Sequence, residues 1–267
     1  MSESIDYSQI DYSRHYNQWH SDTPEHFEQM KFYYQKLLGK FLPSDYQSSI
    51  LDIGCGQGFA MMTLQELGYK TIEGIDVDEQ QINFCLQKKL KVTQVEDTIA
   101  FLADRKEKYH LILLLDVLEH IPLEKQLTFT RKIQEALKEG GQLIGTVPNA
   151  NSSLASRWRY IDWTHYLSFT EYSLDFLLFN AGFQDICIYE TEFFDAPNFN
   201  FLFSRAILKK SYWKTLLHYF IFRCVRYSRR LTAIAELSWE QGLKIPLSLN
   251  LLVSARKSET IDSHLET

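Results

Sequence analysis

Cysteine is scarce in this chain of 267 residues, and its four copies are scattered. No two of them have the close spacing of a zinc motif, and four distant cysteines do not make the framework of a disulfide-rich domain. The pattern therefore argues against a zinc site and a disulfide framework, and it favours a reducing, cytoplasmic setting. The positions are Cys55, Cys85, Cys187 and Cys224.

Other absences narrow the class of protein further. The N-terminal residues are polar and lack the apolar core of a signal peptide, and no internal repeat is visible. Basic residues are not in excess: the formal net charge is −6, whereas a general nucleic-acid-binding domain is usually basic. The chain is long enough for one large domain with an added lobe, and 45% apolar residues suffice for its core.

The clearest motif occupies residues 50–58. Two apolar residues precede Asp52, and Gly54, Gly56 and Gly58 then alternate before a helical pattern opens at Phe59. Glycine accepts a positive φ and places no Cβ between the main chain and a ligand. The motif predicts a buried strand that ends in a tight, ligand-binding turn.

A second apolar run, residues 71–75, ends at Asp76, eighteen residues after Gly58. An acidic residue at that place suits the ribose hydroxyls of a nucleotide. The spacing Gly-x-Gly-x-Gly differs from the dinucleotide pattern and resembles motif I of class I S-adenosylmethionine (SAM)-dependent methyltransferases. The resemblance implies SAM as cofactor, S-adenosylhomocysteine as product, and a first set of cofactor-binding residues: Asp52, Gly54, Cys55, Gly56, Gly58, Asp76 and Val77.

Strand and helix patterns then alternate. Strands are predicted at residues 91–95, 111–115 and 142–147, and the order strand–helix, repeated five times, is typical of a doubly wound parallel sheet. The segment Asp116-Val117-Leu118-Glu119-His120 resembles motif IV of the same methyltransferases. The resemblance places Asp97 and Thr98 near the adenine, and Asp116 and Val117 near the methionine half of the cofactor. For Asp97 the alternative is a helix N-cap that needs no ligand.

These patterns predict an α/β fold with a mostly parallel, Rossmann-like sheet, which the family builds from seven strands. We expect an N-terminal lid and helix at residues 1–45, a SAM-binding core at 46–192, a helical insertion at 193–246, and the last strand with a polar tail at 247–267. Aromatic residues near the N-terminus resemble the lid of small-molecule methyltransferases, although they could equally pack on the domain surface. They are Tyr12, Tyr16 and Trp19.

The acceptor is expected along residues 149–168, a polar and aromatic stretch after a strand. His120 and His165 are the candidate general bases, because imidazole titrates near neutral pH; each could instead be structural. Asp162-Trp163-Thr164-His165 resembles the Asp-x-Thr-His segment of methyltransferases from polysaccharide and sugar pathways. The residues predicted to contact the substrate are Asn149, Trp158, Tyr160, Asp162 and Trp163.

A metal site is a weaker alternative for the same residues. Asp116, Glu119 and His120 would lie on one helical turn, and His165 could complete an N/O ligand set. Metal-dependent quinone and small-RNA methyltransferases have a similar cluster, but with Glu where this chain has Asp116. That departure favours base catalysis without a metal.

The predicted insertion contains a basic, amphipathic stretch at residues 205–232, too often interrupted by charge to span a bilayer. It could lie on the inner face of a membrane, cap the substrate pocket or form a homodimer interface. The sequence thus predicts an O-methyltransferase of a sugar or glycan, either free or lipid-linked, and no nucleic-acid partner. The alternatives are a quinone or phenol O-methyltransferase, an amino-sugar N-methyltransferase, and an inactive SAM-binding scaffold.

Overall fold

The computed structural model describes residues 20–191 and 210–258. The predicted lid residues Tyr12, Tyr16 and Trp19 lie outside these ranges. The described elements in chain order are α2 (Pro24–Leu38), β1 (Ser49–Ile53), α3 (Phe59–Glu66), β2 (Thr71–Asp76), α4 (Glu79–Gln87), β3 (Val92–Gln94), α5 (Thr98–Ala103), β4 (Tyr109–Leu115), the 3₁₀ turn η2 (Leu118–His120), α6 (Leu123–Ala136), β5 (Leu137–Pro148), α7 (Ala155–Tyr160), α8 (Glu171–Asn180), β6 (Phe183–Glu190), α10 (Lys210–Glu236), α11 (Trp239–Lys244) and β7 (Asn250–Lys257).

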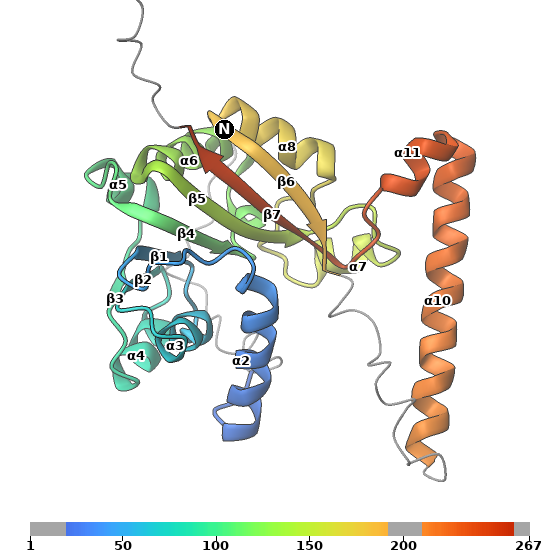
Figure 1. The fold of residues 1–267 in the computed structure, drawn as a ribbon, viewed down its shortest axis with the longest axis horizontal. Helices are drawn as coiled ribbons and strands as arrows, with labels where there is room; N and C mark the ends of the chain where they lie inside the picture. The colour runs from blue at the N-terminus through green and yellow to red at the C-terminus, as the bar shows by residue number, and fades with distance from the viewer. Residues whose placement is uncertain (1–19, 192–209, 259–267) are drawn as a thin grey trace, which may run out of the picture.

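Seven strands form one twisted sheet in the order β3-β2-β1-β4-β5-β7-β6 (Figure 1). The pairs from β3 to β5 are parallel, whereas β7 runs antiparallel to both β5 and β6. This arrangement confirms the predicted mostly parallel α/β sheet. Because β1 and β4 are neighbours although two strands separate them in sequence, the strand order reverses between them, and ligands bind at such a switch point.

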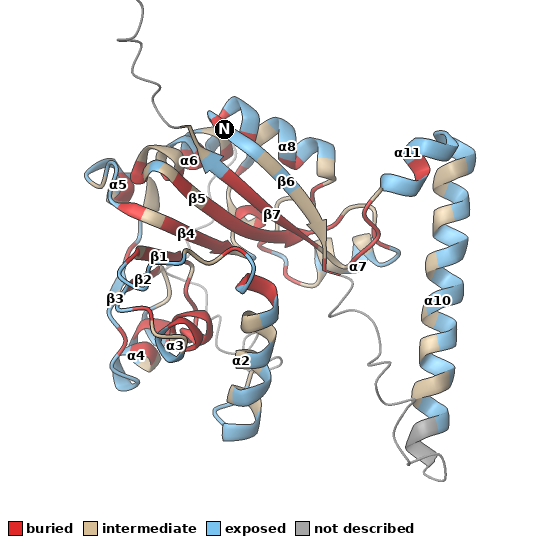
Figure 2. Ribbon diagram, in the orientation of Figure 1, coloured by how far each residue is buried: buried red, intermediate tan, exposed pale blue. Residues whose placement is uncertain are grey.

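Both faces of the sheet are covered, as the nearly continuous apolar strands predict. Leu51 and Ile53 point to one face, where they pack with side chains of α5, α6 and α8. Ile50 points to the other face, where Met61 of α3 and side chains of α2 and α4 cover the sheet. Figure 2 shows the buried residues concentrated on the central strands.

The structure adds detail before and after the strand predicted at residues 142–147. In the polar and aromatic stretch 149–168, residues Ala155–Tyr160 form the short helix α7. The strand itself is longer than predicted, because β5 begins at Leu137 and passes through Gly140 and Gly141. Pairing between β4 and β5 is irregular there, since the register shifts between Tyr109 and Leu111, and Gly140 absorbs the distortion with a φ of 67°.

The helices α10 and α11 fall within the predicted insertion. In Figure 1, α10 stands apart from the sheet and is joined to it through α11 and the segment leading to β7. Gly242 permits the close contact between these two helices, because a Cβ at that position would lie 2.4 Å from the backbone nitrogen of Ile234. The body and the projecting helix are therefore distinct parts of the molecule.

Candidate functional site

The glycine motif forms the turn between β1 and α3. Gly54, Gly56 and Gly58 all have positive φ, at 70°, 51° and 72°. A Cβ on Gly54 would lie 2.4 Å from Cγ2 of Val117, and one on Gly58 would lie 2.3 Å from Cδ1 of Leu90. Only glycine therefore fits the first and third positions, for both conformational and packing reasons.

The acid at the end of β2 is built into this turn. Asp76 accepts a hydrogen bond from the backbone N–H of Gly56 at 2.8 Å, through Oδ2, and one from Asp78 at 2.9 Å, through Oδ1. Burial raises the pKa of Asp76, although the hydrogen bonds from Asp78 and Gly56 oppose that shift. The two motifs separated by eighteen residues thus form one structure, as the sequence predicted.

Two predicted cofactor residues lie behind the turn. The side chain of Asp52 is 2% exposed, and burial together with the neighbouring Asp76 raises its pKa to about 8. Cys55 is also buried, and its Cβ and sulfur would each lie 3.0 Å from a Cβ on Gly74. Both residues support the turn from inside, and their direct contact with cofactor remains a prediction.

The remaining predicted cofactor residues lie at the carboxyl ends of neighbouring strands. Asp97 caps α5, which begins at Thr98, by accepting a hydrogen bond from Ala100 N–H at 3.0 Å; the N-cap alternative is confirmed. Asp116 follows β4 with a φ of 54°, and its Oδ1 accepts hydrogen bonds from Thr146 and Asn250. Val77 accepts a hydrogen bond through its carbonyl from Gln94, 3.2 Å away.

The beginning of α3 fits an anionic group. Gly58 supplies no side-chain cap to this helix, so the first backbone N–H groups of α3 have no N-cap side chain to which they can donate. Helix N-termini attract anions, and the amino-acid carboxylate of SAM is one. Together with the backbone of the glycine turn, of which Gly54 is partly exposed and Gly56 and Gly58 are buried, and with the carboxyl group of Asp76, these groups match the chemistry of SAM.

The second motif contributes the acceptor side of the site. His120 Nδ1 lies 2.9 Å from Oγ1 of Thr164, and that hydroxyl donates to Oδ1 of Asp162 at 2.7 Å. A threonine hydroxyl has a single proton, so His120 must donate through Nδ1–H. The neutral imidazole of His120 therefore has its basic lone pair on Nε2.

His165 is oriented in the same way by a backbone group. Its Nδ1 lies 3.0 Å from the carbonyl oxygen of Trp158, which can only accept, so Nε2 is again the basic nitrogen. The two imidazoles are in edge-to-face contact with centroids 4.5 Å apart. A backbone hydrogen bond of 2.7 Å from Tyr166 N–H to the Glu119 carbonyl joins the two segments.

Asp162 is the anchor of this arrangement. Its side chain is buried, which by itself would raise its pKa, but two hydrogen bonds from Thr164 and the nearby His120 and His165 outweigh burial and lower the pKa. Asp162 therefore stays ionised and holds Thr164, and through it His120. No role was predicted for Thr164, although its position between Asp162 and His165 in the motif could have indicated one.

Glu119 completes the cluster. It is 1% exposed, its Oε2 has no hydrogen-bond partner, and burial, with Asp116 and Asp162 nearby, raises its pKa well above the usual value. Within the described parts of the chain, Glu119, His120 and His165 each offer a ligand atom, all within 4.8 Å of one another.

The predicted metal site had four residues, and the structure excludes one of them from the cluster. Asp116 does not belong to this group, because it lies outside the 3₁₀ turn of Glu119 and His120 and its carboxylate is bound to Thr146 and Asn250. The other three residues do come together. Neither the base nor the metal interpretation depends on Asp116.

Two of the residues predicted to contact the substrate, Asn149 and Asp162, are buried. Asn149 is fully buried and donates hydrogen bonds to the carbonyls of Pro246 and Ser248, so it ties the loop after β5 to the segment before β7. Asp162 is 7% exposed, and its Oδ1 accepts hydrogen bonds from the backbone N–H and the hydroxyl of Thr164. Trp158 is half-buried, whereas Tyr160 and Trp163 are 74% and 72% exposed and remain predicted acceptor contacts.

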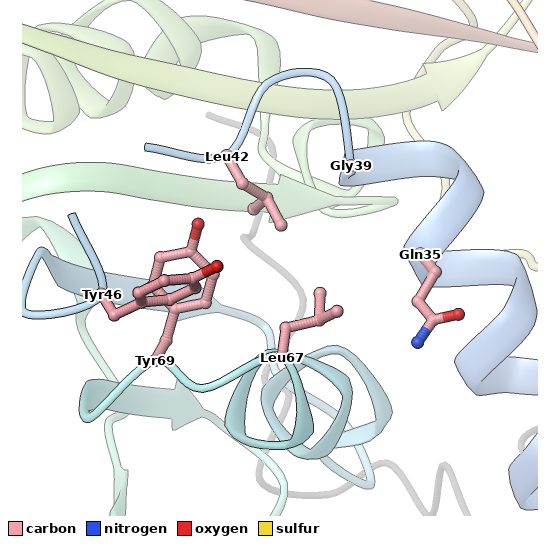
Figure 3. Close-up of a pocket in the computed structure, with 6 residues that line it drawn as sticks. All are labelled: Gln35, Gly39, Leu42, Tyr46, Leu67 and Tyr69. Atoms are coloured by element: carbon pink, nitrogen blue, oxygen red, sulfur yellow. The ribbon is translucent and has the colours of Figure 1, made fainter. Parts of the chain in front are cut away.

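A hollow of about 440 Å³ opens at the end of the strands that lies away from the glycine turn, between α2 and the end of α3 (Figure 3). Tyr69 and Tyr46 lie in it with ring centroids 5.2 Å apart, and the Tyr69 hydroxyl donates to the carbonyl of Pro43. Because Tyr69 precedes β2, this hollow lies at the amino ends of the strands. It contains none of the predicted site residues.

Known proteins resemble this chain over the same region. A methyltransferase-domain family model matches residues 25–188. The chain is 34% identical to a ribosomal protein L11 methyltransferase of Ruminiclostridium cellulolyticum over 77 residues, which are 28% of this chain and 24% of that protein. It is also 34% identical to a ubiquinone biosynthesis O-methyltransferase of a Chelativorans species over 99 residues, 36% of this chain and 38% of that protein. The chain thus spans well under half of either relative.

The fold has solved counterparts. A SAM-dependent methyltransferase from Archaeoglobus fulgidus superposes with a TM-score of 0.63 and 20% identity, over 92% of this chain and all of the other. The family match covers more than half of the chain and includes the glycine turn, Asp76 and the Asp116–His120 segment. With the sheet order, it shows that the chain belongs to the methyltransferase-domain family and has the class I methyltransferase fold.

Proposed function

We propose that this protein methylates a hydroxyl oxygen, with His120 and His165 as the groups that accept the hydroxyl proton. The observation that carries the proposal is the pair of hydrogen bonds that leaves Nε2 as the basic nitrogen of both imidazoles. A hydroxyl must lose its proton during methylation, and an imidazole within hydrogen-bond reach suits that task. When bound, SAM supplies a methyl group on a positively charged sulfur.

The chain's own contribution is to orient the base before transfer. Thr164 and Asp162 hold His120, and the Trp158 carbonyl holds His165, so neither ring needs to rotate when the acceptor arrives. The ionised Asp162 also stabilises the positive charge that His120 gains with the proton. This support resembles the orienting role of a carboxylate in other histidine-dependent sites.

The acceptor class we propose is a saccharide. Tyr160 and Trp163 are exposed, and both lie close to His165 in the sequence. Aromatic faces suit sugar rings. The resemblance of residues 162–165 to the sugar-pathway methyltransferases supports the same class. A quinol or other lipophilic phenol is the second candidate, favoured by the identity shared with the ubiquinone biosynthesis enzyme.

The test is methyl transfer from isotope-labelled SAM to two panels of acceptors, one of saccharides and one of phenols. Replacing His120 or His165 with alanine should reduce kcat about 100-fold or more and leave the affinity for SAM, measured by calorimetry, unchanged. His218→Ala, at an exposed position on α10, is the matched control. Full turnover in both alanine variants would refute histidine base catalysis, and transfer only to phenols would refute the saccharide assignment.

A further inference from the structure

The helix α10 has one long apolar stripe. Its members succeed one another in alternating steps of four and three residues, a spacing that keeps them on one side of a helix. All are exposed, and the five large ones have exposed fractions between 46% and 67%. At 1.5 Å per residue the stripe is roughly 27 Å long. It consists of Trp213, Leu217, Phe220, Cys224, Tyr227 and Leu231.

The stripe faces away from the body of the protein. Arg229 donates to the carbonyl of Asn151 at 3.0 Å, and Arg230 donates to the carbonyl of Gly242 at 2.9 Å and lies 3.8 Å from Glu190. At 100° per residue, Arg229 lies on the far side of the helix from Leu231 and Tyr227, whereas Arg230 lies at the flank, about 100° from Leu231 and about 60° from Tyr227. The anchored side and the apolar side are therefore different sides of α10.

The charge of α10 is the reverse of that of the whole chain. Between Lys210 and Glu236 the helix has six Lys or Arg residues and a single acid, Glu236 itself, whereas the chain has a net charge of −6. Lys214 and Arg223 are about a quarter turn from the stripe, one on each side of it, and both are exposed. Lys214 and Arg223 thus border the apolar stripe in the half of α10 that begins at Lys210.

We propose that α10 docks the protein on an anionic lipid surface, with the stripe among the acyl chains and the bordering cations at the phosphates. Three aromatic side chains on an apolar face, with basic residues beside it, are the pattern of an interfacial helix. None of the described helices is long and apolar enough to cross a membrane, so α10 lies on the surface.

Two other occupants fit less well. A second copy of α10 would meet the first with like charges, because no acid occurs between Lys210 and Ala235 to pair with Lys214 or Arg223. A nucleic acid would engage the cations but leave the aromatic stripe in water. An anionic lipid surface satisfies both features at once, and it does so whichever acceptor the enzyme uses.

The protein contains its own control helix. On α8, Tyr172, Phe176 and Phe179 form a shorter exposed stripe with the same steps of four and three, each about 70% exposed. The charged residues of α8 are Glu171 and Asp175, and it has no Lys or Arg. If exposed aromatics alone caused membrane binding, α8 would bind as well.

The experiment is flotation of the full-length protein with vesicles of phosphatidylcholine alone and of phosphatidylcholine mixed with phosphatidylglycerol. We expect binding to the mixed vesicles that weakens with salt and is at least about tenfold stronger than to neutral ones. The combined change Trp213→Ser, Phe220→Ser and Tyr227→Ser should abolish it, and Lys214→Gln with Arg223→Gln should remove the preference for anionic lipid. The matched change on α8, Tyr172→Ser, Phe176→Ser and Phe179→Ser, should leave binding intact.

Each contrary outcome overturns the proposal. Folded wild-type protein, as judged by circular dichroism, that floats with neither vesicle refutes lipid docking. A dimer in light scattering that dissociates when the α10 aromatics are replaced, without vesicle binding, assigns the stripe to a second copy. Binding to an RNA oligomer through Lys214 and Arg223, without vesicle binding, assigns the helix to nucleic acid.

Discussion

The two halves of the site are built in different ways. On the cofactor side, Gly54 to Gly58 form the turn through their own backbone, and Asp76 closes it through hydrogen bonds to Gly56 and Asp78. On the acceptor side, His120 and His165 come from segments more than forty residues apart; their rings are in contact, and Thr164, Trp158 and the hydrogen bond from Tyr166 to Glu119 hold them in place. One half is a local motif, and the other is a tertiary assembly.

Because of this difference, the two halves should tolerate different amino-acid substitutions. The glycine turn fails when a side chain is added to it, because Gly54 and Gly58 have positive φ and a Cβ on them would clash with the side chains of Val117 and Leu90. An assembly of side chains fails when an orienting hydrogen bond is lost, while the fold persists. Changes on the cofactor side should therefore affect SAM binding and stability, and changes on the acceptor side should affect turnover alone.

The largest effect is expected from Gly54→Ala. The new Cβ would require a positive φ and would lie 2.4 Å from Val117, so we expect a loss of about 2–4 kcal/mol in stability and no measurable SAM binding by calorimetry. Gly182→Ala is the matched control: its φ is also positive, at 95°, but the nearest atom is a Gln134 side-chain nitrogen at 3.6 Å. Equal losses in both variants would mean that conformation, and not packing under the turn, decides the effect.

The next effect tests the acceptor side. Thr164→Val keeps the shape of the buried side chain but removes the hydroxyl that joins His120 to Asp162, so we expect kcat to fall about 10–100-fold with unchanged SAM affinity. Thr164→Ser, which keeps the hydroxyl, should restore most of the rate. A valine variant with a normal rate and a normal pH profile would show that Thr164 does not position His120.

A smaller effect concerns pH and stability. Because the pKa of Asp52 is about 8 in the folded protein and about 4 in an unfolded chain, the folded state holds the extra proton between these values. Stability should fall as pH rises through that window, by at most about 1.4 kcal/mol per pH unit.

Asp52→Asn has no proton to lose, so its stability should be flatter from pH 5 to pH 7, as urea unfolding at each pH would measure. Asp97→Asn, at an exposed cap that asparagine also forms, should follow the wild type. Identical slopes for Asp52→Asn and the wild type would contradict the buried, protonated state of Asp52.

The smallest effect is expected from metal removal. SAM affinity should be the same with a chelator and with added magnesium, because the group of Glu119, His120 and His165 lies on the acceptor side. Titration calorimetry measures this directly. A chelator that weakens SAM binding would mean that a metal links the two halves of the site.

The sequence alone was sufficient for the sheet, the glycine turn and Asp76, because these depend on strand patterning, on positive φ at three glycines and on a spacing within one βαβ unit. It also suggested that His165 joins the Glu119–His120 segment. The tertiary structure decided which groups orient the histidines, that Asn149 and Asp162 are buried, and that Asp116 is bound to Thr146 and Asn250. Those facts depend on contacts between segments far apart in the chain, and a linear pattern records residue types and spacing but not which distant segments pack together.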